Sequence, residues 1–153
     1  MNGFVGRAAM SGYLTLRALL SPVAFGASAL AFRRDGRLLL VRHSYQPGWM
    51  LPGGGVGRAE LPADAIRREL REEVGLSCPG TPEFVALYTR SAGWVTNHVA
   101  LYRLDDVTID FKPNFEIVEA MFADPNDLPP GTTPPTARRV REMQGLLPRT
   151  GLW

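Results

Sequence analysis

Three glutamates within five residues, Glu69, Glu72 and Glu73, carry the strongest chemical signal in the sequence. Residues three and four apart on a helix are surface neighbours, so this spacing predicts that the three carboxylates share one helix face. Crowded carboxylates repel one another, and a hard divalent cation removes that cost. Mg²⁺ accepts carboxylate oxygens, keeps several waters and bridges to substrate phosphates. The pattern therefore suggests a metal site that handles phosphorylated substrates.

A solvated acidic helix face is the alternative interpretation of the glutamates alone, because Arg68 is placed to pair with Glu72 one turn later. An apolar face adjoins the carboxylates and should pack on a sheet. It consists of Ile66, Leu70 and Val74. The carboxylates are thus expected at the edge of a buried stripe rather than far out in water, but a solvated face remains the better interpretation of the three glutamates alone.

The predicted helix has clear ends, with Pro62 near its start and Gly75 just past its end. Leu61 stands before the proline and cannot cap the helix, which should cost about 1 kcal/mol. Asp64, in the first turn, offsets part of this through the helix dipole. The missing cap is expected to weaken the first turn and leave the glutamates in place.

A longer pattern around the glutamates decides between the two interpretations. It reads G-x5-E-x7-R-E-U-x-E-E-x-G-U, where U is a bulky aliphatic residue, and every specified position is matched. The matching residues are Gly54, Glu60, Arg68, Glu69, Leu70, Glu72, Glu73, Gly75 and Leu76. This stretch resembles the Nudix box, and so many fixed positions at set spacing argue strongly against a chance match.

The resemblance implies an α/β fold, a Nudix-type α/β/α sandwich around a mixed β-sheet. It also implies hydrolysis of the pyrophosphate linkage in a nucleoside diphosphate derivative. Arg68 would hold the glutamates by charge-assisted hydrogen bonds, and Glu60 would support the loop before the helix. The residues that would bind Mg²⁺, or Mn²⁺ as a substitute, are Glu69, Glu72, Glu73 and the backbone carbonyl of Gly54.

Elementary chemistry agrees with these roles. Attack of water on an electron-rich phosphorus requires neutralised oxygens and a deprotonated water, and bound divalent ions supply both. Glu69 or Glu72 would take the proton. A further carboxylate from a facing segment should complete the metal's ligands, and Glu116 and Glu119 are the candidates. We favour Glu116, because it stands at the entry of a predicted strand, whereas Glu119 should share a face with Ile117 and Met121.

The substrate contacts are less clearly specified. Tyr45, Trp49 and Trp94 are candidates for stacking on the base or leaving group, and Arg42 is a candidate phosphate contact. Two other functions stay open: a hydrolase of modified nucleoside triphosphates, and a Nudix-like module that binds a ligand without hydrolysis. The complete glutamate set argues against the second. The expected partner is a small nucleotide, without nucleic acid or membrane, for a monomer or homodimer.

Length and composition fit one domain of 153 residues, with a Nudix core at 23–147 after an N-terminal extension at 1–22. That extension is interpreted as a short packed helix, Tyr13–Leu20, with a targeting segment as the alternative. The single cysteine, Cys78, excludes an intrachain disulfide and suggests a reducing, cytoplasmic setting. The acids are concentrated in the middle of the chain between basic flanks, which suits a central metal with phosphates held from the sides.

The remaining pattern predicts the elements that position the site. Strands are expected at 23–32 and 37–42 around an Asp-Gly turn, then at 83–90, 94–104 and 115–123. The segment 105–113 is polar and turn-like. A closing helix at 135–147, capped by Thr133, carries three arginines that we assign to its solvated face. These are Arg138, Arg139 and Arg141.

Overall fold

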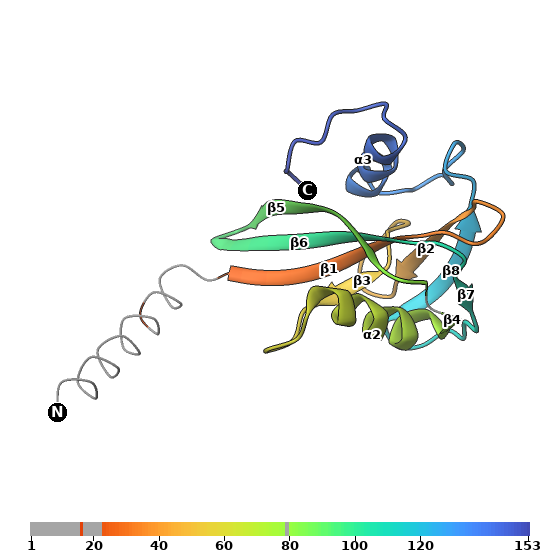
Figure 1. Cartoon of the computed structure of the whole chain (residues 1–153), viewed down its shortest axis with the longest axis horizontal. Helices are drawn as coiled ribbons and strands as arrows, with labels where there is room; N and C mark the ends of the chain where they lie inside the picture. Colours follow the sequence, from red (N-terminus) through yellow and green to blue (C-terminus); the bar gives the residue numbers. More distant parts are fainter. Residues whose placement is uncertain (1–15, 17–22, 79) are drawn as a thin grey trace.

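A mixed four-stranded sheet forms the centre of the computed structural model, which describes residues 16, 23–78 and 80–153. Its strand order is β3 (Gly53–Gly55), β1 (Val23–Ala31), β6 (Val95–Leu104) and β5 (Glu83–Ala92). The two long central strands, β1 and β6, run parallel, and the outer pairs are antiparallel (Figure 1). Strand β1 is therefore flanked on one side by the glycine run and on the other by β6.

Two short strand pairs complete the β structure. β2 (Leu38–His43) pairs with β8 (Ile117–Ala123), and β4 (Leu76–Cys78) pairs with β7 (Thr108–Ile109), both antiparallel. Strand β7 lies in the segment 105–113, which was predicted to be turn-like. That expectation was incomplete, because Thr108 and Ile109 find partners directly after the box helix.

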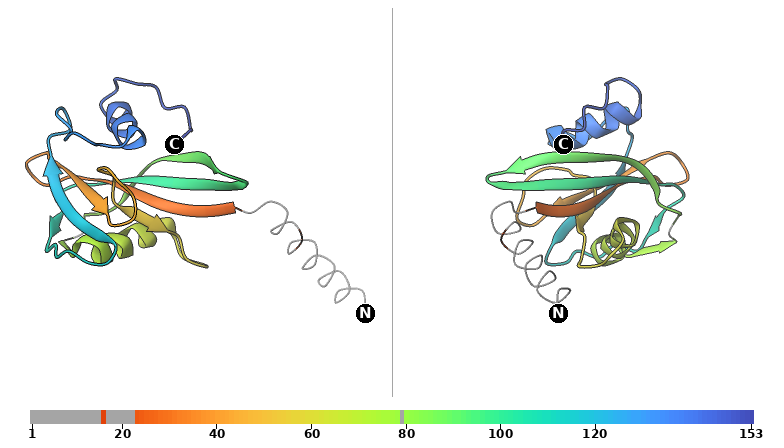
Figure 2. Two further views of the ribbon diagram at one scale, coloured as in Figure 1. Left: turned by 180° about the vertical axis from the view of Figure 1, so that it is seen from behind. Right: turned by 60° about the vertical axis from the view of Figure 1, so that its left-hand side comes forward.

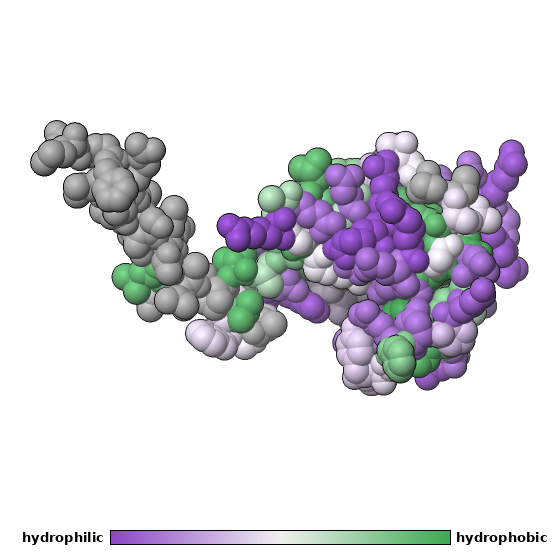
Figure 3. Space-filling view, turned by 90° about the horizontal axis from the view of Figure 1, so that it is seen from below, coloured by the Kyte–Doolittle hydropathy of each residue, from purple (hydrophilic) through white to green (hydrophobic). Residues whose placement is uncertain are grey.

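Helices α2 (Pro62–Val74) and α3 (Pro134–Met143) lie on opposite sides of the strands (Figures 1 and 2). The predicted α/β/α sandwich is thereby confirmed. Each helix covers its own apolar cluster. Ile66, Leu70 and Val74 of α2 are fully buried against alternate residues of β1 and β6, as their spacing predicted. The outer face of α2 is largely hydrophilic (Figure 3).

The ends of α2 follow the sequence closely. Leu61 is the N-cap residue and makes no side-chain capping bond, and Asp64 lies in the first turn. Gly75 takes the left-handed conformation with φ 66°, and its amide donates to the carbonyl groups of Leu70 and Arg71. A glycine suits this position because other residues are strained there. The last turn of α2, which carries Glu72 and Glu73, is thus firmly terminated.

Helix α3 departs from the prediction in two ways. It ends at Met143 rather than at 147, and Arg139 is fully buried instead of solvated. Arg139 Nη2 donates to the Glu142 carboxylate at 2.8 Å, and its guanidinium lies 4.0 Å from the centre of the Tyr88 ring. An arginine can be buried in this way when a carboxylate and aromatic faces replace its water.

The N-terminal helix predicted at Tyr13–Leu20 lies outside the described residues, apart from Leu16. Within the part of the chain that the structure describes, no helix combines the length and apolar character needed to cross a membrane.

Candidate active site

Glu73 is the most deeply buried acid of the box, with 3% of its surface exposed. One carboxylate oxygen accepts a hydrogen bond from the Gly53 amide at 3.1 Å, and the other is buried without a hydrogen-bond partner among the described residues. Burial raises the pKa of Glu73 to about 8, the Gly53 bond opposes that shift, and the charges of Glu69, Glu116 and Glu72 add to it. Such a buried acceptor is expected to have a ligand that the protein does not supply.

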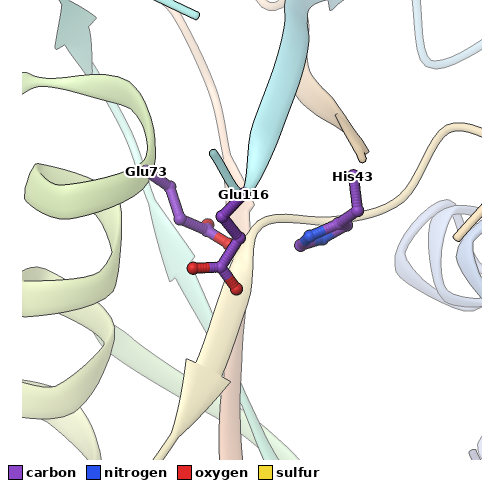
Figure 4. A group of neighbouring side chains, drawn as sticks. All are labelled: His43, Glu73 and Glu116. Atoms are coloured by element: carbon purple, nitrogen blue, oxygen red, sulfur yellow. The ribbon is translucent and has the colours of Figure 1, made fainter. Parts of the chain in front are cut away.

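Glu116 and His43 face Glu73 from the opposite side of the site (Figure 4). One potential ligand atom from each of the three residues lies within 4.8 Å of the others. His43 ends β2, and Glu116 directly precedes β8, so the β2–β8 pair brings both beside α2. The pKa of His43 is lowered by burial, with a smaller opposing effect of Glu116, which favours a neutral imidazole.

Asn114 fixes the segment that carries Glu116. Its side-chain oxygen accepts from the amides of Glu116 and Ile117 at 3.0 and 2.7 Å, and its Nδ2 donates to the Glu73 carbonyl at 3.1 Å. Asn114 therefore joins the start of β8 to the end of α2. Sequence reasoning missed both Asn114 and His43. The Asn-x-Glu spacing, typical of side chain to backbone turns, was the available signal for Asn114.

Glu119 lies on the solvent side and forms an ion pair with Arg42 at 3.1 Å. The expectation that it shares a face with Ile117 is wrong, because the β2–β8 register shifts between them: Ile117 pairs with His43 and Glu119 with Arg42. The extra residue, Val118, forms a bulge, so the side chains before it and after it no longer alternate regularly between the two faces of the strand. Ile117 is consequently buried in the cluster under α2, while Glu119 is exposed.

Arg68 connects the box carboxylates. Its guanidinium donates to both oxygens of Glu60 at 2.9 Å, to Glu69 at 2.7 Å, to Glu72 at 3.3 Å and to the Gly55 carbonyl at 2.9 Å. The hydrogen bonds from Arg68 have the largest effect on Glu60, and the one from the Gly57 amide adds to it; together they lower the pKa of Glu60 to about 2. This network ties the loop at 55–60 to the middle and the later turns of α2, in agreement with the roles that the resemblance implied for Glu60 and Arg68.

The Glu69 carboxylate lies directly over the backbone of Gly54. A methyl group added at Gly54 would stand 2.5 Å from Glu69 Oε2 and 2.6 Å from Oε1, closer than such atoms approach. The side chain of Glu69 is 13% exposed and that of Glu72 61%. Glu69 is therefore held in place by the glycine and Arg68, whereas Glu72 projects toward solvent.

A cavity of about 560 Å³ is bordered by the glycine run that contacts Glu69 and Glu73, although neither carboxylate is among its lining residues. His43, Tyr45 and the glycine run line one part of it. Of the predicted substrate contacts only Tyr45 lines this cavity, and its hydroxyl donates to Glu116 at 3.3 Å. Trp49 instead packs beside the Arg42 guanidinium, 5.5 Å from the ring centre, and Trp94 is 81% exposed at the β5–β6 turn.

The arrangement of a glycine run, an acidic helix and a mixed sheet defines a class that comparison with known proteins confirms. Residues 23–143 match the NUDIX domain family, so the chain belongs to this family. An RNA pyrophosphohydrolase of Xanthomonas oryzae pv. oryzae is 41% identical over 63 residues, which are 41% of this chain and 29% of that protein. The RNA pyrophosphohydrolase of Xylella fastidiosa (strain M12) gives the same identity over 31% of its length. The chain thus matches less than a third of these relatives.

Solved structures show the same fold. A MutT NUDIX hydrolase from Burkholderia pseudomallei superimposes with a TM-score of 0.69 at 23% identity, covering 79% of this chain and 98% of that one. The ORF135 protein of E. coli has a TM-score of 0.65 at 25% identity, covering 82% of this chain and 91% of that one. These likenesses confirm the architecture around the site.

Proposed function

We propose that this protein is a Mg²⁺-dependent hydrolase that cleaves the pyrophosphate linkage of a nucleoside diphosphate derivative. The observation that carries the proposal is the buried Glu73 carboxylate, which has one unsatisfied oxygen and faces Glu116 and His43 beside a cavity. A buried charge of this kind is costly without a cationic partner. The complete box and the named activity of the partial relatives support the same reaction.

The residues present fit a hard divalent metal, because carboxylate oxygens predominate around the unsatisfied Glu73 oxygen. We assign the ligands to Glu69, Glu72, Glu73 and Glu116, with the Gly54 carbonyl. When bound, Mg²⁺ or Mn²⁺ would neutralise phosphate oxygens and lower the pKa of water. His43 lies within reach of the same point, but a neutral imidazole is a less typical partner of Mg²⁺ than an oxygen ligand. We assign His43 to the substrate side of the site.

The protein's own groups have separate tasks in this proposal. Arg68 orients Glu69 and Glu72 through charge-assisted hydrogen bonds. Glu69 or Glu72 accepts the proton of the attacking water. Tyr45, whose hydroxyl donates to Glu116, holds that carboxylate toward the cavity. The cavity beside the glycine run receives the nucleotide part of the substrate.

A second candidate substrate is the 5′ end of a triphosphorylated RNA. The curated relatives named as RNA pyrophosphohydrolases support it, although they share only 63 aligned residues with this chain. The chemistry would be unchanged, since a phosphoanhydride bond is hydrolysed in both kinds of substrate. A wide cavity that opens to solvent is compatible with a nucleotide at the end of a longer strand.

A substrate panel tests both candidates. The purified protein is assayed with Mg²⁺ and phosphate detection on ADP-ribose, dinucleotide polyphosphates, NADH, sugar nucleotides, nucleoside triphosphates and 5′-triphosphorylated RNA. We expect one group to be hydrolysed and Glu72→Gln to abolish its turnover with the fold intact, because Glu72 is mostly exposed. Activity of Glu72→Gln within about threefold of the wild type would contradict the proposed site.

A further inference from the structure

The far part of the cavity lies on the α3 side of the sheet. In β6, the side chain of Leu101 packs in the apolar cluster beneath α3, whereas those of Ala100 and Tyr102 pack in the cluster beneath α2. Because side chains alternate between the two faces of a strand, Val99 and Asn97 lie on the α3 side together with Leu101. In β5, Tyr88 belongs to the same α3 cluster, and Arg90 follows at the next position on that face. Arg90 and Asn97 are direct register partners, and both line the cavity.

Residues 151–153 add a short segment along the free edge of β5. The Thr89 amide donates to the Gly151 carbonyl at 2.8 Å, and the Trp153 amide donates to the Thr89 carbonyl at 3.1 Å. This bridge is parallel and pairs Leu152 with Thr89. The side chain of Trp153 is thereby brought beside Arg90 on the α3 side, where it also lines the cavity.

The Trp153 ring is held by the buried groups around it. It meets the Tyr88 ring edge to face, with centres 5.7 Å apart, and the Arg139 guanidinium lies 5.4 Å from its centre. Arg139 also donates to the Leu152 carbonyl at 2.8 Å. Arg139 therefore fixes both the backbone and the ring of this segment, which explains why an arginine is fully buried in α3. The ring keeps an orientation that contributes to the cavity wall.

From these contacts we propose that Trp153 stacks on the nucleobase of the substrate, with Arg90 and Asn97 contacting the polar edge of that base. The inference rests on the proposed function and specifies where its nucleotide is recognised. An indole beside a guanidinium and an amide offers a flat apolar surface and hydrogen-bond donors together, which is the chemistry that a base requires. Trp153 is then a specificity-determining residue that the sequence pattern did not reveal.

The position of Trp153 relative to the glutamates supports this assignment. Gly55 pairs with Gly26, Gly26 with Val99 and Val99 with Tyr88, so three strand spacings of roughly 4.8 Å separate the glycine run from Tyr88. The 151–153 segment lies one strand further out, so the backbone of Trp153 is about 19 Å from the glycine run and its ring reaches back over Tyr88. Only an extended nucleotide with more than one phosphate reaches across such an interval, which agrees with a nucleoside diphosphate derivative as substrate.

Tryptophan fluorescence tests the proposal without turnover. The protein has three tryptophans, so Trp49→Phe/Trp94→Phe leaves Trp153 as the only one, and Trp49→Phe/Trp153→Phe leaves Trp94. AMP, GMP, CMP and UMP are titrated into each, with ribose 5-phosphate as the control without a base. We expect saturable quenching of Trp153 by at least one nucleotide and none by ribose 5-phosphate. Equal quenching by ribose 5-phosphate, no quenching by any nucleotide, or quenching of Trp94 alone would overturn it.

Kinetics separate this inference from the proposed function. With the nucleotide substrate, Trp153→Leu should raise KM about tenfold with kcat nearly unchanged, and Trp153→Phe should restore most of the affinity. The matched control is Phe84→Leu, which changes an exposed aromatic residue at the far end of β5. An unchanged KM in Trp153→Leu would overturn the stacking role while leaving the hydrolase assignment standing. If the wild type hydrolyses no substrate in the panel, the fluorescence titration still decides whether Trp153 meets a base.

Discussion

The Gly53 amide donates to one oxygen of Glu73 at 3.1 Å, while the second oxygen of that carboxylate is buried with no hydrogen-bond partner among the described residues. The charged form of Glu73 is therefore poorly compensated by the protein alone. In our proposal the missing partner is the catalytic metal. In that proposal the stability of the protein is linked to its function, because the same carboxylate that destabilises the metal-free fold would bind the cation.

Replacing Glu73 by Gln should separate these two effects. The variant keeps an acceptor for the Gly53 amide and removes the buried charge, although its amide nitrogen then lacks a partner. We expect the metal-free protein to become more stable at pH 8 by about 1 kcal/mol and turnover to be lost. Urea unfolding with EDTA and with Mg²⁺ measures both, since only the wild type should gain stability from the metal. A stabilisation by Mg²⁺ that is equal in both proteins would exclude Glu73 as a ligand.

The contact between Gly54 and Glu69 gives a second prediction. Gly54→Ala introduces a methyl group where the Glu69 carboxylate lies, so the side chain must move. Turnover should fall about 100-fold, as expected for a displacement of about 1 Å in a catalytic group. Gly55→Ala is the matched control, because an added methyl group there meets nothing within 4 Å. Circular dichroism should show both variants folded; similar losses in both would point to a general effect on the loop.

The local parts of this site could be predicted from the sequence. The helix, its ends and its two faces depend on residues within a few turns of one another, and the structure has α2 with Ile66, Leu70 and Val74 buried as expected. The fold and the family followed from the fixed spacing of the box. The structure also has Glu69 and Glu72 bound to Arg68, as the resemblance implied.

Features that depend on distant partners could not be predicted. The burial of Arg139 requires Tyr88 and Trp153, which are brought to it only by the folded sheet edge. The bulge at Val118, which turns Ile117 inward, depends on pairing with β2. The alternation rule assumed one continuous strand through Glu116 and Glu119, but Glu116 lies before β8 and the bulge turns Ile117 to a side that the rule did not predict. A periodic pattern in one strand does not contain the register of its partner.

Tyr88 gives a prediction for alkaline pH. Tyr88 is 1% exposed, and its hydroxyl donates to Glu142 at 2.8 Å. Burial, and to a smaller extent the hydrogen bond to Glu142, raise the pKa of Tyr88 to about 12. The folded state therefore retains a proton that the unfolded chain loses near pH 10. The contribution of Tyr88 to the free energy of unfolding is fully present below pH 10. It is lost between pH 10 and 12, which lowers the free energy of unfolding by on the order of 2 kcal/mol. Urea unfolding between pH 9 and 11.5 measures this loss.

The comparison protein for that experiment is Tyr88→Phe, which keeps the ring stacked on Arg139 and removes the ionisable hydroxyl. Its stability should be lower at pH 8, because Glu142 loses a hydrogen bond, and should change less between pH 10 and 12. If plots of the free energy of unfolding against pH stay parallel for the wild type and the variant up to pH 11.5, the raised pKa of Tyr88 would be contradicted.

The last prediction concerns the two acids near the start of β8. Glu116 lies with Glu73 beside the cavity, whereas Glu119 is paired with Arg42 in solvent. Glu116→Gln should therefore raise the Mg²⁺ concentration needed for half-maximal turnover by about tenfold or more, because one charged ligand is lost. Glu119→Gln, the control of identical chemistry three residues away, should leave that concentration within about twofold, since exposed ion pairs contribute little. The measurement is turnover across a Mg²⁺ titration for the wild type and both variants. A loss confined to Glu119→Gln would reverse the assignment, and unchanged titrations in both would mean that substrate and water complete the metal's ligands.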